Sequence, residues 1–168
     1  MIAHGLAPKR AELLEGVMVE KRSKSLLHTQ LLTQLLYALK ASLGEAYWVR
    51  PESPITMHES EPEPDISVVS GKFSDYRAHP TTALLVVEIS VSTLAEDRAM
   101  AALYASAGVG EYWLLNAPAR EVEVFRQPES GVYLEKTVVA ADQILTCLTL
   151  PQVSINLADL WAGLPEGG

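Results

Sequence analysis

Two carboxylates stand at positions where a carboxylate is costly to bury. Asp65 ends the acidic, proline-rich stretch 61–65 and opens a strand-like run, and Glu88 interrupts the apolar run 84–89. A carboxylate inside an apolar strand must be paired, hydrogen-bonded or bound to a metal, because its desolvation is otherwise unfavourable. Two strands this close in sequence can be neighbours in one sheet. They would then bring both carboxylates to one point, and carboxylate oxygens are the ligands that Mg²⁺ and similar cations prefer.

Each carboxylate also has a purely structural explanation. Asp65 follows Pro64 and could be a strand-entry or turn residue. Glu88 could pair with a structural arginine, since a buried charge requires a partner. Carboxyl oxygens that face one cleft would support a shared metal site, whereas carboxylates on opposite faces of the sheet would exclude it.

The chain before Asp65 predicts one amphipathic helix among short strands. Leucines recur every four residues within 25–43, which predicts a helix with one apolar face. Ser23 or Ser25 can cap the start of this helix, and Gly44 favours its end. Short strands are expected on both sides of Gly16 within 12–20, at 46–49 and at 55–57.

The chain around Glu88 predicts a crossover between two parallel strands. A strand at 84–89, a helix at 94–107 and a strand at 111–116 follow one another with short connections. Such a unit makes its two strands parallel neighbours. Antiparallel edge strands are expected at 121–125 and within 132–139, and a short helix at 157–161. The predicted fold class is mixed α/β (α+β): a central mixed sheet flanked by helices, with one parallel βαβ crossover, in a single domain over 1–168.

Composition favours an acidic globular protein. The chain has 168 residues, a size at which one domain with a full core is the norm. Its net charge of -8 is not typical of a protein that coats nucleic acid nonspecifically, although it is compatible with a local basic cleft. No apolar run approaches the roughly 20 residues of a spanning helix, so no membrane contact and a cytoplasmic location are expected. The single cysteine, Cys147, cannot form an internal disulfide and is expected to be buried.

A series of short motifs resembles one known family. Pro64-Asp65 followed by Glu88 in an apolar strand resembles the PD-(D/E)xK nuclease superfamily. The longer matches are Glu12-Leu13-Leu14-Glu15-Gly16, His28, Val87-Glu88-Ile89-Ser90-Val91-Ser92-Thr93, Asp97, Leu103-Tyr104-Ala105, Ala107-Gly108-Val109 and Glu111-Tyr112-Trp113. In this order they are similar to the putative restriction endonuclease family within that superfamily, over about residues 12–161. The resemblance implies a restriction-endonuclease-like core.

The resemblance implies a metal-dependent phosphodiesterase that acts on DNA. Asp65, Glu88 and the backbone carbonyl of Ile89 would hold Mg²⁺ or Mn²⁺, and Glu20 is expected as a further acidic ligand. Asp97 completes the predicted catalytic set with Asp65 and Glu88. A homodimer is the expected assembly, because a two-fold protein matches a duplex with two strands to cut.

Several of these residues keep simpler explanations. Glu20 could be a solvated residue at a strand end, and Asp97 could be a first-turn charge that suits the helix dipole. His28 could be a satisfied, partly buried histidine. Tyr104 is more typical of a core or interface aromatic residue. Lysines such as Lys24 could donate to a phosphate, but most lysines are simply solvated.

The sequence departs from the family at one lysine. Ser90 occupies the usual position of that lysine, two residues after Glu88. The resemblance implies that in this family the lysine is displaced onto the next helix, about one turn after Asp97. Residues 98–104 contain no lysine, and Arg98 has the wrong spacing and the wrong shape to replace a compact donor. The segment from Asp97 to Tyr104 is also one residue shorter than the family pattern.

The shortening has a structural consequence. Deleting one residue from a helix rotates everything after it by about 100°. Either the helix is reset, or a residue is absent between Met100 and Ala101. The leading hypothesis is therefore a Mg²⁺-dependent endonuclease. The alternatives are a catalytically impaired nuclease-fold protein that binds nucleic acid or a protein partner, and a structural homo-oligomer.

Overall fold

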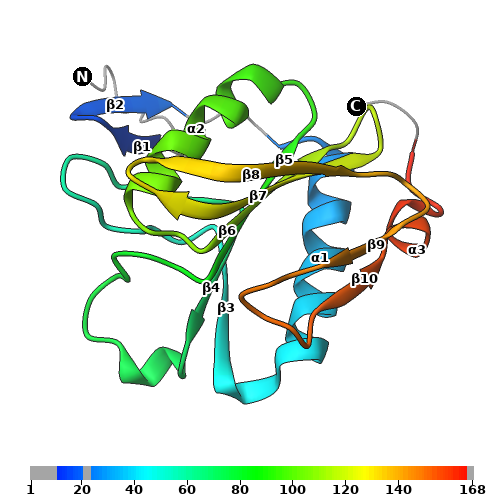
Figure 1. Cartoon of the computed structure of the whole chain (residues 1–168), viewed down its shortest axis with the longest axis horizontal. Helices are drawn as coiled ribbons and strands as arrows, with labels where there is room; N and C mark the ends of the chain where they lie inside the picture. The colour runs from blue at the N-terminus through cyan, green and yellow to red at the C-terminus, as the bar shows by residue number, and fades with distance from the viewer. Residues whose placement is uncertain (1–10, 21–23, 166–168) are drawn as a thin grey trace, which may run out of the picture.

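A six-stranded mixed sheet carries helices on both faces (Figure 1). The structure is a computed structural model and describes residues 11–20 and 24–165. In spatial order the strands of this sheet are β3 (Tyr47–Pro51), β4 (Ile66–Ser70), β5 (Leu85–Ser90), β6 (Glu111–Asn116), β7 (Glu121–Glu129) and β8 (Val132–Val139). Neighbouring strands are antiparallel except β5 and β6, which are parallel. The predicted fold class and its parallel crossover are confirmed.

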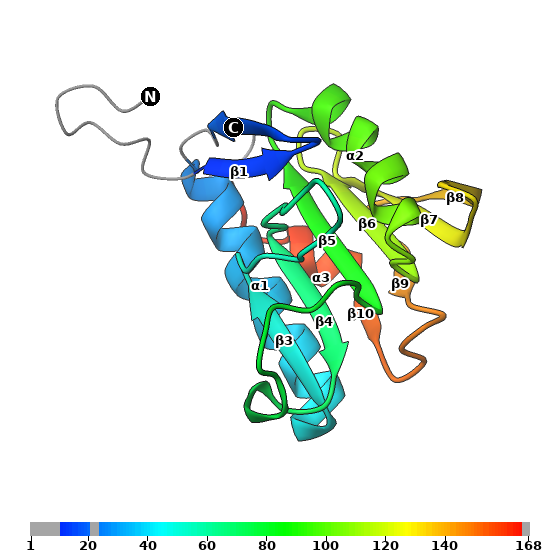
Figure 2. The ribbon, with the colours of Figure 1, turned by 90° about the vertical axis from the view of Figure 1, so that its left-hand side faces the viewer.

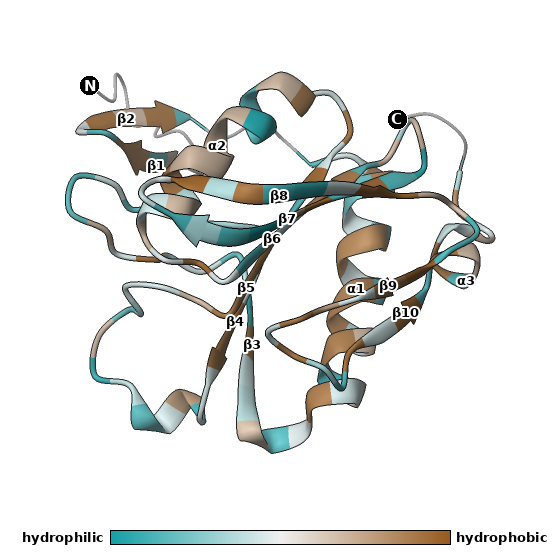
Figure 3. Cartoon of the chain, in the orientation of Figure 1, coloured by the Kyte–Doolittle hydropathy of each residue, from teal (hydrophilic) through white to brown (hydrophobic). Residues whose placement is uncertain are grey.

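Helix α1 (Leu26–Leu43) covers one face of the sheet and helix α2 (Leu94–Ser106) covers the other (Figure 2). The α1 leucines spaced four apart are buried against the sheet because this spacing keeps them on one side of the helix. Figure 3 shows apolar residues along α1 and along the strands that it covers. The Ser25 hydroxyl caps the start of α1 by accepting the His28 N–H at 3.1 Å. This cap fixes where α1 begins, at the end of the sheet that carries Asp65.

Smaller elements complete the described chain. They are the hairpin of β1 (Ala11–Leu14) and β2 (Val17–Glu20), the 3-10 turns η1 (Gly44–Ala46) and η2 (Phe73–Asp75), the hairpin of β9 (Ile144–Thr146) and β10 (Ser154–Asn156), and helix α3 (Leu157–Trp161). Residues Leu157, Leu160 and Trp161 of α3 join the core beneath α1, and Cys147 is buried as expected. Within the described ranges, no helix is both long and apolar enough to cross a membrane.

Two expectations about strands were wrong. Residues 55–57 form a loop, in which the Ile55 N–H donates to the Pro62 carbonyl and the Thr56 N–H to the Pro80 carbonyl. The prolines at 54, 62 and 64 leave no continuous row of donors for a strand ladder here. Strand β7 is interior, because β8 pairs with its outer side, so of these two strands β8 alone lies at an edge of the sheet.

Candidate active site

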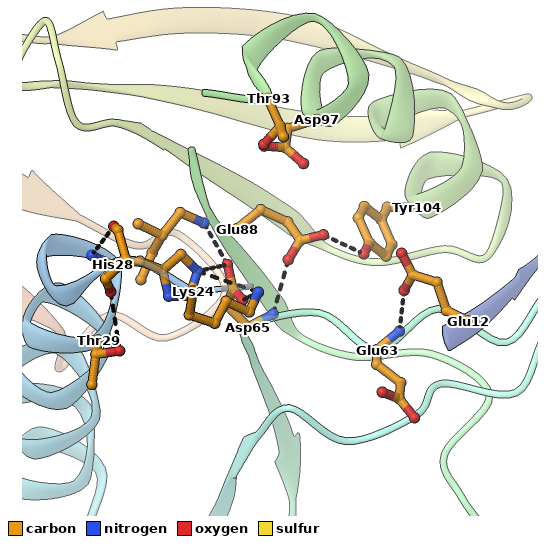
Figure 4. A network of polar contacts seen from close by, with 12 residues as sticks. Glu12, Lys24, His28, Thr29, Glu63, Asp65, Glu88, Thr93, Asp97 and Tyr104 are labelled. Atoms are coloured by element: carbon orange, nitrogen blue, oxygen red, sulfur yellow. Dashed lines mark hydrogen bonds and ion pairs between the residues drawn. The ribbon is translucent and has the colours of Figure 1, made fainter. Parts of the chain in front are cut away.

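Asp65 and Glu88 lie together at the junction of β4 and β5 (Figure 4). The Asp65 N–H donates to Glu88 Oε1 at 2.8 Å, and the Ile89 N–H donates to Asp65 Oδ2 at 2.7 Å. Each carboxylate therefore binds backbone of the neighbouring chain segment. Both residues are buried, at 3% exposure for Asp65 and 7% for Glu88. Because the two strands are antiparallel neighbours, each of these carboxylates can bind the backbone beside the other, and we call this a crossed pair. The alternative in which the two carboxylates lie on opposite faces of the sheet is therefore excluded.

A pocket of about 550 Å³ opens over the two carboxylates. Hairpin β1–β2, the start of α1 and the first turns of α2 supply its walls. Six of the residues that line it are acidic: Glu12, Glu20, Asp65, Glu88, Glu96 and Asp97. Such a concentration of carboxylates favours cations over anions inside the pocket.

Two side chains from the start of α1 hold the Asp65 carboxylate. Lys24 Nζ lies 3.1 Å from Oδ1, and His28 Nε2 lies 3.1 Å from Oδ2. Burial alone would raise the pKa of Asp65. The hydrogen bond and charge of His28, the charge of Lys24 and the Ile89 N–H outweigh that effect and lower the pKa to about 2. Asp65 is therefore an anion throughout the physiological pH range.

The stability of the fold should depend on this anion. The pKa of Asp65 is lowered from 3.8 to about 2, so its contribution to folding is complete above pH 4 and is lost as the pH falls through 2. The free energy of unfolding of the native protein should fall by about 2 kcal/mol more than that of Asp65→Asn between pH 5 and pH 2. Urea unfolding at a series of pH values measures this difference. Parallel pH profiles for the two proteins would contradict the ion-pair account.

The Tyr104 hydroxyl holds the Glu88 carboxylate. It donates to Oε2 at 3.1 Å from the buried face of α2. Burial, followed by the charge of Glu88, raises the pKa of Tyr104 well above its usual value, so the hydroxyl keeps its proton and stays a donor. The sequence predicted a core or interface aromatic residue here. Its spacing of seven residues from Asp97, two helical turns, is the signal that places both on one face of α2.

Asp97 lies on the first turn of α2 and lines the same pocket. Its Oδ2 accepts the Thr93 hydroxyl at 2.6 Å, so Thr93 binds a side chain instead of capping a backbone N–H. Burial raises the pKa of Asp97 and the charge of Asp65 adds to this rise, whereas the Thr93 hydrogen bond opposes it. Asp97 therefore accepts a proton more readily than Asp65 does.

The remaining predicted metal ligands lie around the pocket. Ile89 lines it beside Glu88, and Glu20 lines it from the end of β2, where its side chain is exposed. Glu12 on β1 also lines the pocket and accepts the Glu63 N–H at 2.7 Å. The structure thus brings every predicted site residue to one pocket.

The donor set is compatible with Mg²⁺ or Mn²⁺. Among residues 11–20 and 24–165, no three histidine, cysteine, aspartate or glutamate side chains are grouped closely enough to hold a metal by themselves. Mg²⁺ does not require such a cage, because it usually takes one or two carboxylates and completes its shell with water and substrate phosphates. Asp65 and Glu88, two buried carboxylates beside an open pocket, match that requirement.

Helix α2 carries no lysine toward the pocket. It is a continuous α-helix in which the Tyr104 hydroxyl still reaches the Glu88 carboxylate. The shorter segment after Asp97 therefore does not rotate Tyr104 out of contact with Glu88. Met100, one turn before Tyr104, lines the pocket from this helix. Arg98 instead binds Glu123 on β7 through three hydrogen bonds of 2.7–3.0 Å. Arg98 is thus a structural cation and does not replace the lysine.

Comparison with known proteins identifies the family. The model of the Uma2 family, described as putative restriction endonucleases, matches residues 6–158. The chain belongs to this family. The match includes all six acidic residues of the pocket. No curated protein matches the chain.

A solved structure shares the Uma2 fold seen here. It is a crystal structure of a putative nuclease from Anabaena variabilis, with a TM-score of 0.75 and 17% sequence identity. The alignment covers 92% of this chain and 91% of that chain. At this identity the likeness shows a common fold over nearly the full length of both proteins.

Proposed function

We propose that this protein is a metal-dependent endonuclease that hydrolyses phosphodiester bonds of DNA. The observation that carries the proposal is the crossed pair of Asp65 and Glu88, buried at the base of an acidic pocket in a chain of the Uma2 family. Asp65, Glu88 and the Ile89 carbonyl would hold Mg²⁺ or Mn²⁺, with Glu20 as a further ligand from the rim. A metal bound there would lower the pKa of a coordinated water and neutralise charge on the phosphate.

The protein's own groups keep the two carboxylates in place. The Ile89 N–H and His28 orient Asp65, and the Asp65 N–H with the Tyr104 hydroxyl orients Glu88. Ligands held this way keep their orientation when substrate enters, which is the usual role of groups that support a metal site. Asp97 is the third catalytic carboxylate in this proposal. Its raised pKa suits a group that takes a proton during hydrolysis.

Cleavage of supercoiled plasmid and of single-stranded DNA tests the function. With millimolar Mg²⁺ or Mn²⁺ the native protein should nick or linearise the plasmid, and a chelator should stop the reaction. Cleavage that continues in excess chelator would contradict a metal-dependent mechanism. Tight metal binding without cleavage of either substrate would favour the catalytically impaired alternative. We also propose a homodimer, which light scattering of the purified protein tests directly.

Tyr104→Phe should impair cleavage while the fold remains intact. The change removes one hydroxyl that orients Glu88, and loss of such a supporting group typically costs about 10- to 100-fold in activity or metal affinity. Tyr133→Phe is the matched control, because its hydroxyl donates to the Val109 carbonyl at 2.7 Å, outside the pocket. Steady-state cleavage should fall only in Tyr104→Phe. Equal activity of both variants would show that Tyr104 serves packing alone.

A further inference from the structure

Lys24 lies where the pocket requires a positive charge. Its ammonium is 3.1 Å from Asp65 Oδ1 and 3.5 Å from His28 Nε2 (Figure 4). The side chain is 21% exposed, so it is largely withdrawn from solvent yet still open to the pocket. Among the residues that the structure describes, it is the only lysine or arginine that lines this pocket.

A phosphodiester that enters this acidic pocket needs positive charge beside it, from the protein as well as from the proposed metal. The substrate is an anion, and charge grows on its oxygens in the transition state, while six carboxylates line the walls. A lysine ammonium is a compact, mobile point charge that can leave one anion for another within reach. A phosphate placed beside the Asp65 carboxylate would lie next to this ammonium.

Within residues 11–20 and 24–165, the arginine of helix α2 does not supply this charge. Arg98 is held by Glu123 on β7, and helix α2 presents Met100 to the pocket one turn before Tyr104. Lys24 enters instead from the opposite wall, directly before Ser25, the residue that caps α1. The cap fixes the start of α1, and thereby holds the lysine stem over the base of the pocket.

We propose that Lys24 is the catalytic lysine of this active site: its ammonium binds the phosphate under attack and stabilises charge in the transition state. This inference rests on the proposed nuclease function. It assigns to the start of α1 the positive charge that α2 lacks. The competing explanation is a structural ion pair that only neutralises Asp65.

Lys24→Gln separates the two explanations. The amide keeps a hydrogen-bond donor for Asp65 but carries no charge. We expect kcat for DNA cleavage to fall about 100-fold, as for loss of one transition-state donor. Mn²⁺ affinity, measured by calorimetry, should be retained or increased, because the ammonium no longer competes at Asp65. Lys40→Gln, near the far end of the same helix and exposed, is the matched control and should cleave as the native protein does.

A double variant tests whether a lysine introduced on α2 restores the activity lost in Lys24→Gln. Met100→Lys in the Lys24→Gln background places an ammonium in the pocket from α2 and should recover at least about 10-fold of the lost kcat. A structural ion pair predicts no such recovery, because the α1 contact stays absent. Thermal unfolding of each variant shows whether the fold is retained, and Lys24→Met repeats the test should Lys24→Gln unfold.

Three results would overturn the assignment. Lys24→Gln cleaving as fast as the native protein would show that the charge is not used. Loss of Mn²⁺ binding together with activity would mark Lys24 as structural, and so would failure of Met100→Lys to restore cleavage. If the native protein itself does not cleave DNA with Mg²⁺ or Mn²⁺, the proposed function fails first and Lys24 has no catalytic role. The native control therefore distinguishes the two failures.

Discussion

Asp65→Asn and Glu88→Gln should each lower metal-dependent DNA cleavage by at least about 1000-fold. A metal ligand contributes several kcal/mol to stabilising the transition state, and each 1.4 kcal/mol corresponds to about tenfold in rate. Both substitutions keep the size of the side chain, and the amide oxygen can still accept the buried N–H that the carboxylate accepts now. The loss should therefore appear in single-turnover cleavage at saturating Mg²⁺ without loss of the folded state.

Exposed acidic residues provide the controls for this prediction. Asp142→Asn and Glu129→Gln make the same chemical changes at exposed positions that do not line the pocket, and both should cleave as the native protein does. Circular dichroism spectra should be superimposable for all five proteins. Cleavage by either Asp65→Asn or Glu88→Gln at more than a tenth of the native rate would mean that the reaction takes place elsewhere.

Arg126→Met should destabilise the protein by about 3–5 kcal/mol, the usual cost of leaving a buried charge without its partner. Glu111 on β6 is fully buried, and Arg126 Nε lies 3.0 Å from its Oε1. The same carboxylate accepts the Trp113 indole N–H at 2.6 Å and the Leu148 N–H at 3.0 Å. Arg126 thus neutralises the Glu111 carboxylate, which connects β6, β7 and the segment after β9.

Urea unfolding measures this loss, with Arg77→Met as the control. Like Arg126, Arg77 donates to a backbone carbonyl, but Arg77 lies at the surface. Arg77→Met should therefore change the free energy of unfolding by less than about 0.5 kcal/mol. Arg126→Met should keep the native slope with urea and shift only the midpoint. A loss below about 1 kcal/mol would show that Glu111 is stabilised by its other donors alone.

The elements of this fold follow from local patterns of residues. Leucine spacing predicts α1 to within a residue of its start, and the 84–116 crossover follows from two apolar runs separated by a helix of the right length. The loop at 55–57 could not be predicted from its apolar residues. Its backbone bonds go to Pro62 and Pro80, and those partners are set by the tertiary path of the chain.

The sequence identifies some residues of the candidate site and gives no sign of others. Asp65 and Glu88 are conspicuous in the sequence because charge in an apolar strand is costly. Lys24 carries no such signal, since a lysine before a helix is ordinarily solvated and its contact with Asp65 exists only once α1 packs on the sheet. Tyr104 likewise resembles a core residue until α2 is placed over β5.

Titration of the native protein with Mn²⁺ by calorimetry tests the central claim most directly. If Asp65 and Glu88 form a metal site, the native protein should bind Mn²⁺ saturably, in the millimolar range or tighter. Asp65→Asn and Glu88→Gln should both lose this binding, whereas Asp142→Asn should bind as the native protein does. No measurable affinity in the native protein, or unchanged affinity in the two site variants, would contradict the account.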